Sequence, residues 1–127
     1  ESYELYIDLH RDAWVEGQAG QNTVSAGGVQ VAKLMLLIGK GEGDTGTGYD
    51  RKPDWESNLH IAQQITDALN EQAEGLGKQV RLKSGRFNQH VGKACVLVEA
   101  GNNRNTLEQV LAAMPYLADA IHRTLCP

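Results

Sequence analysis

The stretch "ACVLVEAG", residues 94–101, is an apolar run that closes with Glu99, an alanine and a glycine. Runs of this kind are typical of strands that are covered on both faces, as in a sheet flanked by helices. The stretch "VQVAKLMLLIG", residues 29–39, has the same pattern and predicts a second such strand. Two strands buried in this way indicate an α/β fold with a mixed or largely parallel sheet.

Two alternating stretches predict further strands. Residues 3–9, "YELYIDL", are rich in β-formers, and residues 78–84, "KQVRLKS", predict an edge strand because the outward residues are basic. The segments between these strands are predicted as loops. Residues 15–28 contain Gly and Gln, and residues 39–54 carry Gly at nearly every second or third place. The second of these loops is interpreted as a mobile segment that could form one wall of a groove, and it lacks the residue order of a phosphate-binding loop.

Two amphipathic patterns predict helices. The first begins at the Pro-Asp pair of residues 53–54 and ends before Gly75. The second begins at a capping box formed by Asn105 and Glu108, and Pro115 should kink or split it.

The composition is that of one globular domain, residues 1–127. The chain is 41% hydrophobic and has a formal net charge of −4, so it lacks the clustered basic face that binds nucleic acid. Neither a membrane-spanning stretch nor a signal peptide is predicted. Cys95 is expected as a small buried side chain and Cys126 near the end of the chain as free, because their spacing predicts neither a disulfide nor a zinc site.

His10 and Glu99 each follow an apolar strand pattern. In open α/β sheets, binding and catalytic groups gather outside the carboxyl ends of strands, so these two side chains are candidates for a site. From the residues alone, three interpretations stay open: a structural hydrogen-bonded pair, part of a metal site, or an acid–base couple.

Four stretches in this order resemble the stage II sporulation protein P family of cell-wall amidases and endopeptidases. The most specific are "DLHRD" within residues 6–14 and "FNQ…LVEAG…NTLE" within residues 85–110; residues 32–41 and 55–71 add support. The resemblance implies the fold of the zinc-dependent N-acetylmuramoyl-L-alanine amidases, of which this chain would be the C-terminal portion. It also implies a peptidoglycan hydrolase that cleaves the N-acetylmuramoyl-L-alanine amide bond, with peptide cross-links as a further substrate.

The resemblance also implies roles for single residues. His10 corresponds to a ligand of Zn²⁺, and Glu99 to the catalytic carboxylate that activates the water on the metal. Arg11, beside the ligand, would orient a carboxylate or bind the stem peptide. Asp8 or Asp12 would accept a hydrogen bond from the other ring nitrogen of His10.

Three residues near these motifs are expected to contact substrate: Asn88, Gln89 and Trp14. The first two could instead simply form a turn, whereas His90 beside them is interpreted as an ordinary loop histidine. The other zinc ligands of the family lie in an earlier segment, which is expected before Glu1.

By the same resemblance, the partners are the glycan strand and stem peptide of peptidoglycan, together with a cell-wall hydrolase partner or activator. The expected location is extracytoplasmic, with the full-length protein secreted or tethered to the membrane, and the expected state is a monomer. One alternative is a non-catalytic peptidoglycan-binding module of the same fold. Another is a structural domain in which His10 and Glu99 only bond each other.

Overall fold

A computed structural model describes residues 3–13, 22–43 and 45–127. Its central feature is a four-stranded sheet in the order β1-β6-β4-β5. The strands are β1 (Tyr6–Asp12), β6 (Cys95–Asn102), β4 (Leu34–Gly39) and β5 (Arg81–Lys83). β1 runs parallel to β6 and β5 runs parallel to β4, while β6 and β4 are antiparallel. The expected mixed α/β sheet is therefore confirmed.

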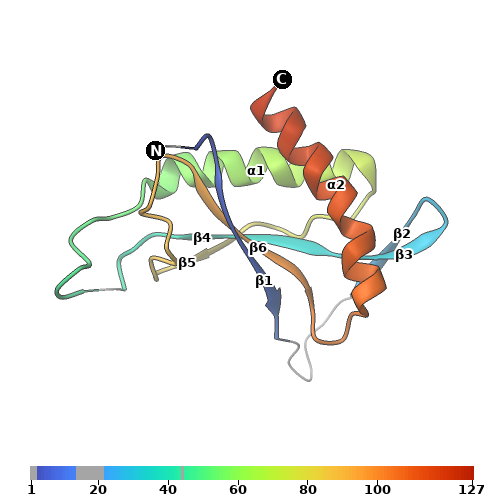
Figure 1. Ribbon diagram of the computed structural model, residues 1–127, viewed down its shortest axis with the longest axis horizontal. Helices are drawn as coiled ribbons and strands as arrows, with labels where there is room; N and C mark the ends of the chain where they lie inside the picture. The colour runs from blue at the N-terminus through green and yellow to red at the C-terminus, as the bar shows by residue number, and fades with distance from the viewer. Residues whose placement is uncertain (1–2, 14–21, 44) are drawn as a thin grey trace.

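Both helices, α1 (Trp55–Gln72) and α2 (Leu107–Leu125), pack on one face of this sheet (Figure 1). The buried cluster between them and the sheet takes alternate residues of the two central strands: Leu34, Leu36 and Ile38 from β4, and Val96, Val98 and Ala100 from β6. The opposite face of the sheet carries the intervening residues. In the described part of the chain, that opposite face lies free of helices.

The predicted strand over residues 29–39 is two strands. β3 (Val29–Ala32) leaves the main sheet and pairs with β2 (Thr23–Ala26) in a hairpin, so the expected loop over residues 15–28 contains a strand. The two residues between the strands, Gly27 and Gly28, have φ of 58° and 81°, as a type I′ turn requires. The hairpin packs against α2.

The start of α2 differs from the predicted capping box by one residue. Thr106 is the N-cap, and Gln109 supplies the reciprocal bond. Asn105 is unavailable because its buried side chain accepts from the backbone N–H of Asn102 and donates to the carbonyl of Asn22. Pro115 lies on the exposed side of one continuous helix and does not divide it.

The other element predictions fit with small shifts. Asp54 is the N-cap of α1, its carboxylate accepting from the N–H of Ser57, and β5 is an edge strand as predicted. β1 starts three residues later than predicted and also ends three residues later, at Asp12, so His10 lies inside the strand and not beyond it. Both cysteines are free. Among the described residues, neither helix is long and apolar enough to cross a bilayer.

Candidate active site on the open face of the sheet

The parallel pairing of β1 and β6 sets His10 directly beside Glu99. Side chains alternate between faces along a strand, and Val96 and Val98 point to the helices. Glu99 therefore lies on the open face, and its register partner His10 lies there with it. Asp8 shares this face, two residues earlier on β1. The expected convergence of a histidine and a carboxylate is what the sheet produces.

The Glu99 carboxylate is half-buried and forms no ion pair among the described residues. Its Oε2 atom is buried and has no hydrogen-bond partner among the described residues. Burial raises the pKa of Glu99, and the negative charge of Asp12 adds to the rise, while His10 and Lys83 oppose it. A raised pKa and an unused oxygen are what a group that takes up and returns a proton requires.

The end of β6 needs glycine at position 101. Gly101 has φ of 69°, a backbone region that other residues rarely adopt, and a Cβ there would lie 2.6 Å from Oδ1 of Asn105. The same Asn105 side chain closes the turn by accepting from the N–H of Asn102. The strand ends at Asn102, three residues after Glu99, so the carboxylate stays near the rim of the sheet.

His10 is held by Asp8. The ring Nε2 lies 2.8 Å from the Asp8 carboxylate, and both side chains are substantially exposed. Asp12 is engaged differently, because its carboxylate accepts from the N–H of Ala13. Of the two aspartates considered for the imidazole, the structure selects Asp8. Within the described residues the hydrogen bond of His10 goes to Asp8 and not to Glu99, which disfavours the interpretation of a purely structural His10–Glu99 pair.

The described residues do not complete a zinc site. No group of three or more His, Cys, Asp or Glu side chains in the described ranges is placed to hold a metal ion. Two groups on this face suit a zinc site. They are the solvent-accessible imidazole of His10 and, beside it, the carboxylate of Glu99, whose Oε2 has no partner among the described residues. Further ligands would have to come from outside the described residues.

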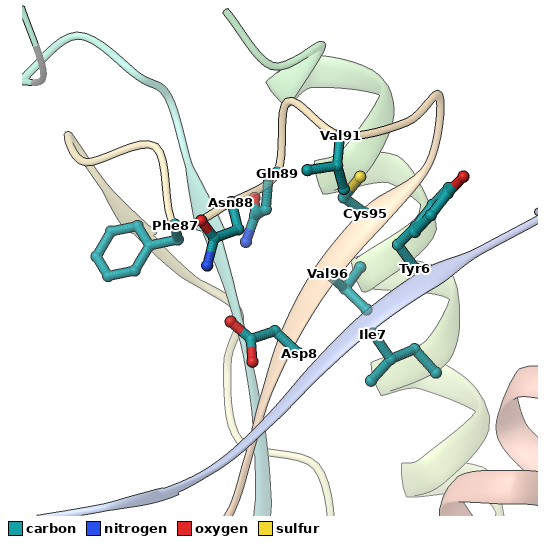
Figure 2. A pocket seen from close by; sticks show the side chains of 9 residues that line it. All are labelled: Tyr6, Ile7, Asp8, Phe87, Asn88, Gln89, Val91, Cys95 and Val96. Carbon is teal, nitrogen blue, oxygen red and sulfur yellow. The ribbon is translucent and has the colours of Figure 1, made fainter. Parts of the chain in front are cut away.

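A pocket of about 230 Å³ adjoins this face on the side of Asp8 (Figure 2). The turn after β5 forms one wall, where Phe87 and Asn88 have φ of 49° and 60°, a strained left-handed region for residues other than glycine. In Figure 2 the Asp8 carboxylate points toward this turn. Backbone strain of this kind is concentrated at functional sites, and here it presents the exposed Asn88 side chain at the pocket.

Gln89 fills a structural position at the back of this pocket. Its amide oxygen accepts from the N–H of Gly39, and its amide nitrogen donates to the carbonyl of Leu37, both at 2.9 Å. The side chain is 1% exposed and takes the place that a neighbouring strand would occupy beside the end of β4. The turn-forming interpretation of this residue therefore has direct support, and a substrate contact remains a prediction.

The two remaining predicted site residues are less informative. Arg11 is exposed and lies where the β1–β6 register shifts, between His10 and Asp12. Trp14 lies outside the described residues.

Lys83 is a site residue that the sequence did not predict. Its register partner, Gly39, lies on the open face, and the charge of Lys83 reaches Glu99. The basic outward residues of the predicted edge strand were the available signal.

Fold and site together define a mixed α/β domain with a half-buried carboxylate beside a histidine on its open face. Residues 1–122 match the family described as stage II sporulation protein P (SpoIIP). The chain belongs to this family, as the sequence motifs indicated.

Solved structures of similar fold are amidases. One is the crystal structure of the apo form of the N-acetylmuramyl-L-alanine amidase Ami1 from Mycobacterium abscessus, at 16% identity and a TM-score of 0.53, covering 96% of this chain and 53% of that one. Another is Ami1 from Mycobacterium smegmatis, at 16% identity and a TM-score of 0.49, covering 95% of this chain and 51% of that one. This chain thus spans about half the length of either amidase. No curated protein matches it.

Proposed function

We propose that this chain forms part of a zinc-dependent peptidoglycan hydrolase that cleaves the amide between N-acetylmuramic acid and the L-alanine of the stem peptide. The observation that carries this proposal is the half-buried Glu99 carboxylate, whose buried Oε2 has no partner among the described residues, next to His10 on an open sheet face. Membership of the SpoIIP family and the amidase-like fold support it.

Glu99 would act as the proton carrier. Its raised pKa lets it take a proton from the attacking water and return that proton to the leaving amine of L-alanine. Its position at the rim, fixed by the turn at Gly101, leaves room for a scissile carbonyl on the open face. Lys83, on the same face, would stabilise the carboxylate when it is ionised.

His10 would be one zinc ligand, with the others supplied from outside the described residues. Zinc, when bound, acts as a Lewis acid on the carbonyl and lowers the pKa of a water molecule. Asp8 would fix the orientation and tautomer of the imidazole through the 2.8 Å bond. Arg11 and Asn88 are proposed contacts for substrate, which the full-length protein would meet as a monomer at the cell wall, outside the cytoplasm.

The decisive experiment compares Glu99→Gln with Glu108→Gln, an exposed glutamate in the first turn of α2. The full-length protein is incubated with dye-labelled cell-wall sacculi, and its metal content is measured by mass spectrometry. Glu99→Gln is expected to abolish dye release with the metal content unchanged, and Glu108→Gln to behave as wild type. Full activity of Glu99→Gln would overturn the role of Glu99. Binding of sacculi by wild type without dye release would favour the non-catalytic binding module.

A further inference from the structure

A second, larger pocket of about 790 Å³ lies at the amino-terminal ends of β1 and α1. Its size falls within the usual range for ligand sites, roughly 300–1,000 Å³. The residues that line it come from three separate segments, and three of these residues are cationic: Arg51, Lys52 and Lys93. Neither the amidase motifs nor the proposed mechanism uses these side chains.

The charge of this pocket is opposite to that of the whole chain. The chain has a net charge of −4, yet the pocket gathers three cations around a single carboxylate, Asp54. That carboxylate already accepts from the N–H of Ser57 as the N-cap of α1. Arg51 and Lys93 are exposed, and neither has an ion pair within the described residues. Two cations are therefore available to an anionic ligand. The amino end of α1 also favours a negatively charged ligand.

The cationic wall has a defined position. Lys52 donates to the carbonyl of Gly41 at 2.8 Å, and Arg86 donates to the carbonyls of Gly48 and Arg51. The Arg86 guanidinium also stacks 4.4 Å from the ring centre of Tyr49. These bonds tie the glycine-rich loop after β4 to the turn after β5, so the loop presents Arg51 from a fixed backbone.

Two tyrosines form the aromatic part of the pocket. Tyr3 and Tyr6 pack edge to face, with ring centres 5.5 Å apart. Gly92 lets the ring of Tyr6 lie against the backbone, because a Cβ there would be 2.3 Å from a Tyr6 ring carbon. His90 also lines the pocket, and its buried Nδ1 has no hydrogen-bond partner among the described residues. The pocket thus offers apolar ring surface and cations.

This pocket and the smaller pocket beside Asp8 adjoin each other. Together they form a track that starts at the candidate active site. Tyr6 and Val91 line both the larger pocket and the smaller one, which also contains Asp8. His10 lies four positions after Tyr6 on β1, a span of about 13 Å at the rise of a strand. A peptide of four or five extended residues covers about the same length.

We propose that this basic pocket binds the carboxylate-bearing far end of a stem peptide whose first amide bond lies at Glu99; the identity of the ligand rests on the proposed function. Arg51 and Lys93 attract carboxylates at the far end of the track, where the carboxylate of the pocket lining is the helix-capping Asp54. The track therefore fixes the direction in which an anionic peptide lies, and an uncharged peptide of equal length binds more weakly.

The test measures binding and not turnover. Soluble muropeptides, each a disaccharide with one stem peptide, are titrated into the Glu99→Gln protein by calorimetry, once with free carboxylates and once with amidated carboxylates. The variant Arg51→Gln/Lys93→Gln is compared with Arg123→Gln, which removes a cation beside the opposite end of α1. Arg51, Lys93 and Arg123 are exposed, so these substitutions are expected to leave the fold intact, and circular dichroism checks this for each variant and for the Glu99→Gln parent.

The double variant and the amidated ligand should each weaken binding about tenfold or more, as expected when charge-assisted hydrogen bonds are lost. Arg123→Gln should bind as the parent does. Equal affinity of the double variant and the parent, or no binding by the parent, would overturn the site. Equal affinity for the amidated ligand would overturn recognition of carboxylates. Inorganic phosphate that binds as tightly as the muropeptide would overturn the peptide as ligand. Turnover by wild type is assayed separately, so failure of the proposed function is distinguished from failure of this site.

Discussion

His10 and Glu99 are register partners on two adjacent parallel strands, β1 and β6, although they lie far apart in the sequence. Both side chains lie on the open face of the sheet, His10 two residues after Asp8 on β1 and Glu99 two residues after Leu97 on β6. Because β1 and β6 run in the same direction, their carboxyl ends meet at one edge, and the two side chains must share it. The site is thus a consequence of strand order.

Glu99→Gln should stabilise the fold at neutral pH. The pKa of Glu99 is raised above its ordinary value of 4.5, so the folded state holds the proton more tightly than the unfolded state. The wild type therefore loses stability as pH rises from below 4.5 through the folded-state pKa, and the glutamine variant lacks this loss. Thermal denaturation of both proteins at pH 7 and near pH 4 checks this: the variant should melt higher at pH 7, and the difference should shrink at pH 4. A wild type that melts higher at pH 7 would contradict the burial argument.

Asp8→Asn should weaken the function of His10 without unfolding the strand. Asp8 is exposed enough for the amide to be tolerated, but the anionic acceptor 2.8 Å from the imidazole is lost. Loss of such a partner typically costs about 10- to 100-fold in metal affinity or activity. Zinc titration and turnover of the full-length protein measure the effect. Asp12→Asn, which leaves the His10 bond in place, is the matched control. An effect of Asp12→Asn equal to that of Asp8→Asn would show that total charge, and not the bond, matters.

Gln89→Leu should destabilise the protein by about 2–3 kcal/mol, because a buried N–H on Gly39 and a buried carbonyl on Leu37 lose their partners. Urea unfolding measures the difference in the free energy of unfolding. Asn88→Gly is the neighbouring control. That residue is exposed at φ of 60°, so glycine should leave the stability unchanged or slightly higher. Similar stabilities for Gln89→Leu and wild type would show that the two bonds add nothing.

Gly92→Ala should displace the ring of Tyr6, since the new Cβ would lie 2.3 Å from a ring carbon. Overpacking of this kind costs about 1–3 kcal/mol. A double-mutant cycle with Tyr6→Ala isolates the collision. In the Tyr6→Ala background, the same Gly92→Ala change should cost markedly less by urea unfolding. Equal costs in the two backgrounds would place the strain elsewhere.

The apolar patterns of the sequence were sufficient for the buried strands and for both helices. These patterns are local: a helix or a buried strand reveals its faces through residues a few positions apart. The hairpin of β2 and β3 had a local signal as well, because Gly27 and Gly28 separate two short alternating runs, but the apolar run to residue 39 obscured it. The capping box shifted by one residue because Asn105 is engaged by Asn102 and Asn22, partners that no local pattern reveals.

The sequence by itself determined which residues could do chemistry, through the family motifs around His10 and Glu99. Only the tertiary structure decided how they are used. In the structure Asp8 hydrogen-bonds to His10, and the Gln89 side chain hydrogen-bonds to the backbone of β4. Oε2 of Glu99 has no hydrogen-bond partner among the described residues. The tertiary structure also brought Arg51 and Lys93, which no motif connects, into one pocket. Such groupings depend on strand order and on loops that meet across the sheet, and long-range contacts of this kind leave no periodic trace in the chain.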